Sequence, residues 1–144
     1  MSPPRSSRRL VLGLLVLMIA GCGGSSSTAP TPLSIAGDWT GTWQFVTSGV
    51  TVTDNVRATF TQTDTATGTW IADGGATGQF SFAVAPTVSG TFTVTQVKVS
   101  GPTCTQTASL TGTVSTNSMT LSVPTIASSP QCSWATNNQF SLHR

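Results

Sequence analysis

The sequence has no tyrosine, no glutamate, a single histidine and few charged residues of any kind. Only 7% of its 144 residues are charged, against about a quarter in an ordinary globular protein. The four aspartates are scattered without calcium-loop spacing, and no glutamate exists for glycoside chemistry. A Ser-His-Asp triad would have to use His143, the penultimate residue. These absences disfavour an enzyme, and we expect neither a metal nor a cofactor.

The few basic residues are unevenly placed along the chain. The first nine residues hold three of the six Lys and Arg side chains. After Cys22 only Arg57, Lys98 and Arg144 remain, against four aspartates. This part of the chain is therefore near neutral, and it has no basic patch that would neutralise nucleic-acid phosphates. We expect no nucleic-acid partner, and we expect Asp54 and Arg57 to form a surface contact.

Residues 10–20 form an apolar run that follows a basic start and precedes small residues. This order is typical of a secretory signal peptide. The eleven residues make a helix of about 16 Å, too short for a hydrocarbon core of about 30 Å. A permanent transmembrane helix is therefore the weaker interpretation. Arg8-Arg9 also resembles part of a twin-arginine export signal, so the export route stays open.

Ile19-Ala20-Gly21-Cys22 resembles the lipobox of bacterial lipoproteins. The resemblance implies a signal peptide at residues 1–21, lipidation of Cys22, and a membrane partner held through that lipid; a plain secretory signal is the alternative. Residues 22–32 then form a flexible Gly/Ser/Pro tether. Gly23 stands where enterobacterial lipoproteins retained at the inner membrane carry Asp. This implies an outer-membrane protein facing the periplasm or the cell surface.

Residues 33–144 predict one all-β domain. Apolar and polar residues alternate with period two, and no segment shows helical periodicity. Turn residues such as those at 47–49 and 72–75 predict short antiparallel connections. The alternating segments are 39–45, 56–61, 68–72, 78–82, 90–95, 108–114 and 119–123, and an eighth that has Trp134 near its start and closes with Phe140 and Leu142.

Eight short strands in about 110 residues predict a closed, antiparallel up-and-down barrel. A β-sandwich is the alternative. The fragments TGTW, TGQF, SGTF and TGTV each place a glycine two residues before a large apolar side chain on the same face. In a small barrel, such glycines relieve crowding where strands bend around the axis.

The stretch IAGDWTGTW at residues 35–43 resembles the opening of the calycin superfamily, the lipocalins and avidins. Gly37-Asp38-Trp39 matches the lipocalin Gly-x-Trp, and Gly41-Thr42-Trp43 resembles the first strand of avidins. The resemblance implies an eight-stranded meander barrel with a small-molecule cavity at one end. It also implies a late arginine packed against the first-strand tryptophan, for which Arg144 is the matching residue.

The chain departs from avidins at Phe45, which stands where they carry an Asn that binds biotin, so biotin is not the implied ligand. The opening is also similar to Thr-rich bacterial lipoproteins that begin with Trp-x-Gly-x-Trp. That group has no assigned activity to carry over.

Cys104 and Cys132 are expected to form a disulfide, since an exported compartment permits one. In the predicted meander they begin the sixth and eighth strands, which lie about 9.6 Å apart. A disulfide needs Cα atoms within about 7 Å. At least one cysteine must therefore lie in a loop, or the seventh strand must end before that level.

Inward tryptophan and phenylalanine side chains are the candidate ligand-binding residues, with core filling as the alternative. We expect a non-enzymatic barrel that holds a small apolar or mixed ligand. A structural lipoprotein, whose filled barrel docks another envelope protein through an exposed apolar patch, is the second hypothesis. The candidate ligand-binding residues are Trp43, Phe45, Trp70, Phe80 and Phe92.

Overall fold

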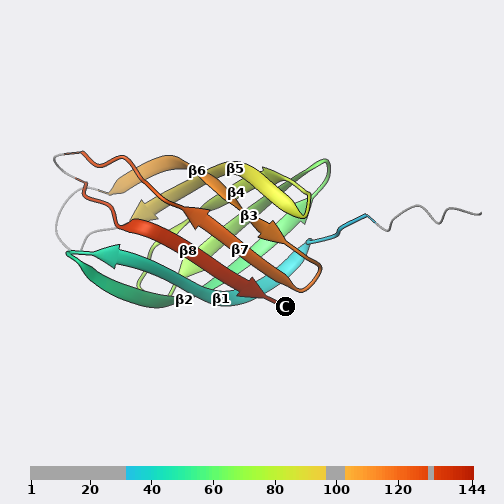
Figure 1. Cartoon of the computed structure of the whole chain (residues 1–144), viewed down its shortest axis with the longest axis horizontal. Coiled ribbons are helices and arrows are strands. Elements are labelled where there is room, and N and C mark those ends of the chain that lie inside the picture. The colour runs from blue at the N-terminus through green and yellow to red at the C-terminus, as the bar shows by residue number, and fades with distance from the viewer. Residues whose placement is uncertain (1–31, 97–102, 130–131) are drawn as a thin grey trace, which may run out of the picture. The chain divides into compact units, whose positions relative to one another are not determined.

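The structure, a computed structural model, describes residues 32–96, 103–129 and 132–144. Each of eight strands pairs antiparallel with the next, and the last pairs with the first, so the sheet closes into a barrel (Figure 1). The predicted up-and-down barrel is thereby confirmed, and the sandwich alternative is wrong. The strands are β1 Gly37–Thr47, β2 Val50–Gln62, β3 Thr65–Ala72, β4 Thr77–Ala83, β5 Thr87–Gln96, β6 Cys104–Val114, β7 Ser118–Val123 and β8 Thr136–His143. The predicted signal peptide, Cys22 and the tether up to residue 31 lie outside the described residues.

The alternation of polar and apolar residues is the alternation between the outside and the inside of the barrel. In β3, every second residue from Ala66 to Ala72 is buried, while Thr67, Thr69 and Ile71 between them are exposed. Strand β2 is longer than the sequence predicts, because it begins at Val50 rather than at residue 56. Residues 50–55 pair with β1 beyond the packed core, so they need no apolar inner face.

Inward glycines face large side chains on neighbouring strands. Gly68 lies opposite Phe60 on one side and Phe80 on the other. A Cβ atom on Gly90 would collide with the carbonyl oxygen of Ser81. Gly68 therefore leaves room for the ring of Phe60, and at Gly90 the two strands approach so closely that no side chain fits between their backbones.

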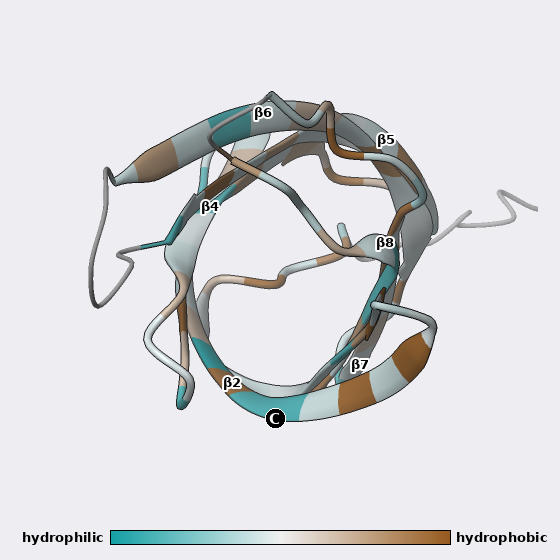
Figure 2. Cartoon of the chain, turned by 90° about the vertical axis from the view of Figure 1, so that its left-hand side faces the viewer, coloured by the Kyte–Doolittle hydropathy of each residue, from teal (hydrophilic) through white to brown (hydrophobic). Residues whose placement is uncertain are grey.

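The two ends of the barrel are built differently. We call the end with the turns 63–64, 84–86 and 115–117 the closed end, because residues 32–36 pass across it and bury Ile35 completely. The opposite end, the mouth, carries the turns 48–49 and 73–76 and the longer loop 124–135. Figure 2 looks into the mouth, where the chain before β8 returns across the ring of strands.

Arg144 seals the closed end. Its guanidinium lies 5.0 Å from the centre of the Trp39 ring, which is the contact that the lipocalin resemblance implies. The same group donates hydrogen bonds to the carbonyl oxygens of Ser34 (2.7 Å), Ala36 (2.9 Å) and Thr116 (2.6 Å). One side chain therefore ties the entering segment to the β6–β7 turn.

We expect Gly90→Ala to lower the free energy of unfolding by about 2–3 kcal/mol, because the added methyl group forces two strands apart. Thr91→Ala is the matched control, since Thr91 is the exposed neighbour on the same strand, and we expect it to cost less than about 1 kcal/mol. Urea unfolding followed by tryptophan fluorescence measures both. Equal losses in the two variants would contradict the close approach.

Arg144→Ala is expected to cost about 1.5–3 kcal/mol in the same assay, since it removes three hydrogen bonds from a charged donor at a partly solvated site. Arg144→Lys should recover less than half of this loss, because one ammonium group does not span carbonyls on two segments. Full recovery of stability with lysine would show that a positive charge is enough to seal this end and that the planar guanidinium group is not needed.

Candidate functional site

A pocket of about 230 Å³ opens at the mouth of the barrel. Its walls come from β1, from the turns at this end, and from the loop 124–135 that leads into β8. The lining residues are Trp43, Phe45, Thr47, Asp54, Gly74, Ala76, Gln96, Ile126, Ser133, Trp134, Ala135 and Asn138.

Two aromatic rings of β1 lie at the base of this mouth pocket. The ring centres of Trp43 and Phe45 are 4.3 Å apart. Beneath them, Trp43 stacks on Phe140 of β8 with centres 5.6 Å apart and planes 4° from parallel. The indole Nε1 of Trp43 donates to Oδ1 of Asn138 at 3.1 Å. The orientation of Trp43 is therefore fixed by a ring stack and by a hydrogen bond.

Asn138 is a fully buried polar residue, and its side chain forms hydrogen bonds at the mouth. Its Nδ2 donates to the carbonyl oxygens of Val123 (3.2 Å) and Ala135 (3.0 Å). It thus joins β8, the end of β7 and the loop 124–135 while it holds Trp43. The sequence prediction started the eighth strand near Trp134 but considered only its apolar residues, Phe140 and Leu142, so it did not single out Asn138. An amide two residues before Phe140, on the inward side of an alternating strand, is the signal that would have found it.

A disulfide attaches the loop 124–135 to the barrel wall. Cys104 is the first residue of β6, Cys132 lies in the loop, and their Cα atoms are 5.8 Å apart. The predicted pairing is present, and both geometric conditions placed on it are met. One cysteine lies in a loop, and β7 has already ended at Val123.

Hydrogen bonds at the end of β6 fix which way each backbone group points. The N–H of Val114 donates to the carbonyl oxygen of Pro86 on the β5 side at 2.9 Å. The N–H of Ser115 donates to Ser118 across the β6–β7 turn at 2.8 Å. In an antiparallel strand, the backbone N–H and C=O groups of successive residues point toward opposite neighbouring strands. Even-numbered residues of β6 therefore pair with β5, and odd-numbered residues face β7.

Because β7 is shorter than β6, the ladder between them stops before the mouth. We call the stretch between residues 105–109 and residues 124–129 the seam. Across it the described residues form no backbone hydrogen bond, and one side-chain bond is made, from Nε2 of Gln106 to the carbonyl oxygen of Ala127 at 3.0 Å. The β6 residues whose backbone groups face the seam are Thr105, Thr107 and Ser109.

Asp54 brings a carboxylate to the mouth pocket. Its Oδ2 accepts a hydrogen bond from the N–H of Gly74 at 2.8 Å. The expected contact between Asp54 and Arg57 is wrong, because residues three apart on a strand point to opposite faces. Arg57 instead pairs on the outer face with Asp73 at 3.3 Å.

The aromatic residues predicted to bind a ligand divide into two groups. Trp43 and Phe45 line the mouth pocket. Trp70, Phe80 and Phe92 pack in the centre of the barrel and are at most 3% exposed. There the rings of Trp70 and Phe92 stack with centres 5.5 Å apart. The sequence identifies all five as inward, but it does not tell the depth at which each one lies.

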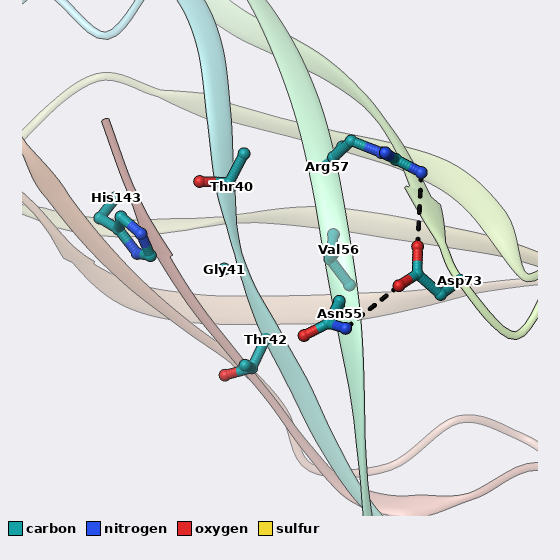
Figure 3. Close-up of a pocket in the computed structure, with 8 residues that line it drawn as sticks. All are labelled: Thr40, Gly41, Thr42, Asn55, Val56, Arg57, Asp73 and His143. Atoms are coloured by element: carbon teal, nitrogen blue, oxygen red, sulfur yellow. Dashed lines mark hydrogen bonds and ion pairs between the residues drawn. The ribbon is translucent and has the colours of Figure 1, made fainter.

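A second, wider hollow lies on the outer face of β1, β2 and β8 (Figure 3), with a volume of about 390 Å³. Arg57, Asp73 and Asn55 form a polar group on one side, with Asn55 donating to Asp73 at 3.1 Å. His143 lies on the other side, across Thr40.

The described residues hold no group of three His, Cys, Asp or Glu side chains placed to bind a metal ion. In the same part of the chain, no helix has the length and apolar character needed to cross a membrane.

The seam predicts a pattern of amide hydrogen exchange. The amides of Thr105, Thr107 and Ser109 have no ladder partner among the described residues, so they should exchange at least about 100-fold faster than those of Gln106, Ala108 and Leu110, which pair with β5. Exchange followed residue by residue by NMR provides this comparison within one strand. Uniform protection along β6 would show that residues 124–129 complete the ladder in solution.

Comparison with protein-family models, with curated proteins and with solved structures finds no match in any of the three. The function must therefore be inferred from the chemistry of the mouth pocket.

Proposed function

We propose that this chain is a lipid-anchored protein of a bacterial envelope that binds a small molecule at its barrel mouth without transforming it. The observation that carries the proposal is the mouth pocket, a recess with an aromatic base above a centre filled by rings. Concave, mostly apolar recesses with a few fixed polar groups are the usual form of small-molecule sites.

The construction of the two ends supports this proposal. The closed end is sealed by Ile35, Trp39 and Arg144, whereas the mouth keeps a recess of about 230 Å³. The calycin resemblance of residues 35–43 implies the same division, with a ligand at one end. Binding is favoured over catalysis because the described lining residues offer one carboxylate, that of Asp54, and no nucleophile beside a base.

The lipid anchor is supported by the lipobox-like residues 19–22 and by the Gly/Ser/Pro composition of residues 22–32. This tether leads into the segment 32–36, which crosses the closed end.

Native mass spectrometry of residues 32–144, made in an oxidising compartment and purified without detergent, tests the binding function. We expect an added mass, acquired from a metabolite extract, that disappears on denaturation. Thr47→Trp should abolish it, because a large ring at this exposed lining position fills the recess. Thr51→Trp, an exposed position in the same hairpin, should retain it.

A docking lipoprotein remains the alternative, and one observation favours it. Ile71 is 47% exposed and borders, with Arg57, a third hollow on the outer face. If the protein keeps its bare mass in every extract, and Thr47→Trp has the same mass behaviour as the unaltered protein, docking is favoured over small-molecule binding.

A further inference from the structure

We infer that the mouth pocket takes a small organic cation, a tertiary or quaternary ammonium compound. This inference rests on the proposed binding function and names the ligand class for the same pocket. It follows from the charge of the lining, from its aromatic surfaces and from its size.

Among the described residues that line the pocket, the charge is negative, because Asp54 is the one ionisable side chain. Its Oδ2 is bound to the N–H of Gly74, and no hydrogen bond to Oδ1 is formed among the described residues. A carboxylate at a partly enclosed recess favours a cation, because their attraction is screened less there than in open water.

No cation of the protein competes for this carboxylate in the described part of the chain. Arg57 points to the outer face, where it is bound to Asp73 at 3.3 Å. Arg144 is at the closed end, where it lies over Trp39 and donates to three carbonyl oxygens. Neither arginine lines the mouth pocket.

The aromatic surfaces also favour a cation. Trp43, Phe45 and Trp134 come to the pocket from two elements, β1 and the loop before β8. The negative face of an aromatic ring attracts a positive group, and tryptophan does so most strongly. Trp43 is 7% exposed, and its ring packs against Phe45 and Phe140, so the partly buried rings of Phe45 and Trp134 offer most of the aromatic surface to a ligand.

The size of the pocket excludes a large ligand. At about 230 Å³ it is smaller than the roughly 300–1,000 Å³ of most drug-sized sites. Methyl groups on nitrogen spread the charge over an apolar surface that matches aromatic walls, whereas a primary ammonium loses more hydration on entering. The geometry therefore favours an alkylated ammonium headgroup over a bare amine.

Isothermal titration calorimetry of residues 32–144, with the disulfide intact, tests the inference with choline and with its neutral isostere 3,3-dimethylbutan-1-ol. We expect choline to bind at least about tenfold more tightly than the isostere, since only choline carries the charge. Tetramethylammonium should compete with choline, because it presents the same headgroup.

Asp54→Asn should weaken choline at least about tenfold and leave the isostere unchanged. Its amide oxygen still accepts from Gly74, so the turn keeps its hydrogen bond. Asp64→Asn, which removes an exposed carboxylate from the turn at the closed end, is the matched control and should bind choline normally. Trp134→Leu should weaken choline more than it weakens the isostere, because it removes a ring and keeps an apolar side chain.

Equal binding of choline and its isostere, or equal effects of Asp54→Asn and Asp64→Asn, would overturn the cation assignment, as would no choline binding at millimolar concentration. The failure of the binding function itself is a different result. It is the absence of any bound mass from metabolite extracts, whereas a neutral or anionic bound molecule would refute the cation alone.

Discussion

The narrow interior of an eight-stranded barrel is the constraint on which the rest of this structure depends. A ring of this size has room for side chains from opposite walls only when small and large residues alternate around it. Glycines such as Gly68 and Gly90 let neighbouring backbones come together and leave space for rings such as Phe60 and Phe80. The alternation of small and large inward residues therefore allows the sheet to close and also fills the interior of the barrel.

A filled centre decides where the chemistry of the molecule is found. The rings of Trp70, Phe80 and Phe92 leave no exposed surface for a ligand in the middle of the barrel. What remains is the mouth, where Trp43 and Phe45 form the top of the aromatic layer. Loop 124–135 raises a wall around it, held by a disulfide at Cys104 and by the amide of a buried asparagine.

Much of the fold could be predicted from the sequence, because period-two alternation reports directly which side of a sheet a residue faces. The disulfide was expected because an exported compartment permits one, and strand spacing added the condition that a cysteine lie in a loop or that the seventh strand end early. The position of Arg144 followed from a family resemblance. The depth of a side chain along the axis is different, since alternation gives the face but not the level. That is why Trp70 and Trp43 looked alike in sequence. Asn138 was missed because hydrogen bonds to loop carbonyls leave no periodic pattern.

The ladder between β1 and β8 joins residues from the two ends of the domain, as in the pairing of Thr40 with His143. Every other ladder joins consecutive strands. Hairpins form quickly because their loops are short, whereas a contact across the whole domain must await the closure of a long loop. Folding should thus proceed through an open, curled sheet with two exposed edges, and the slow step is the meeting of its first and last strands.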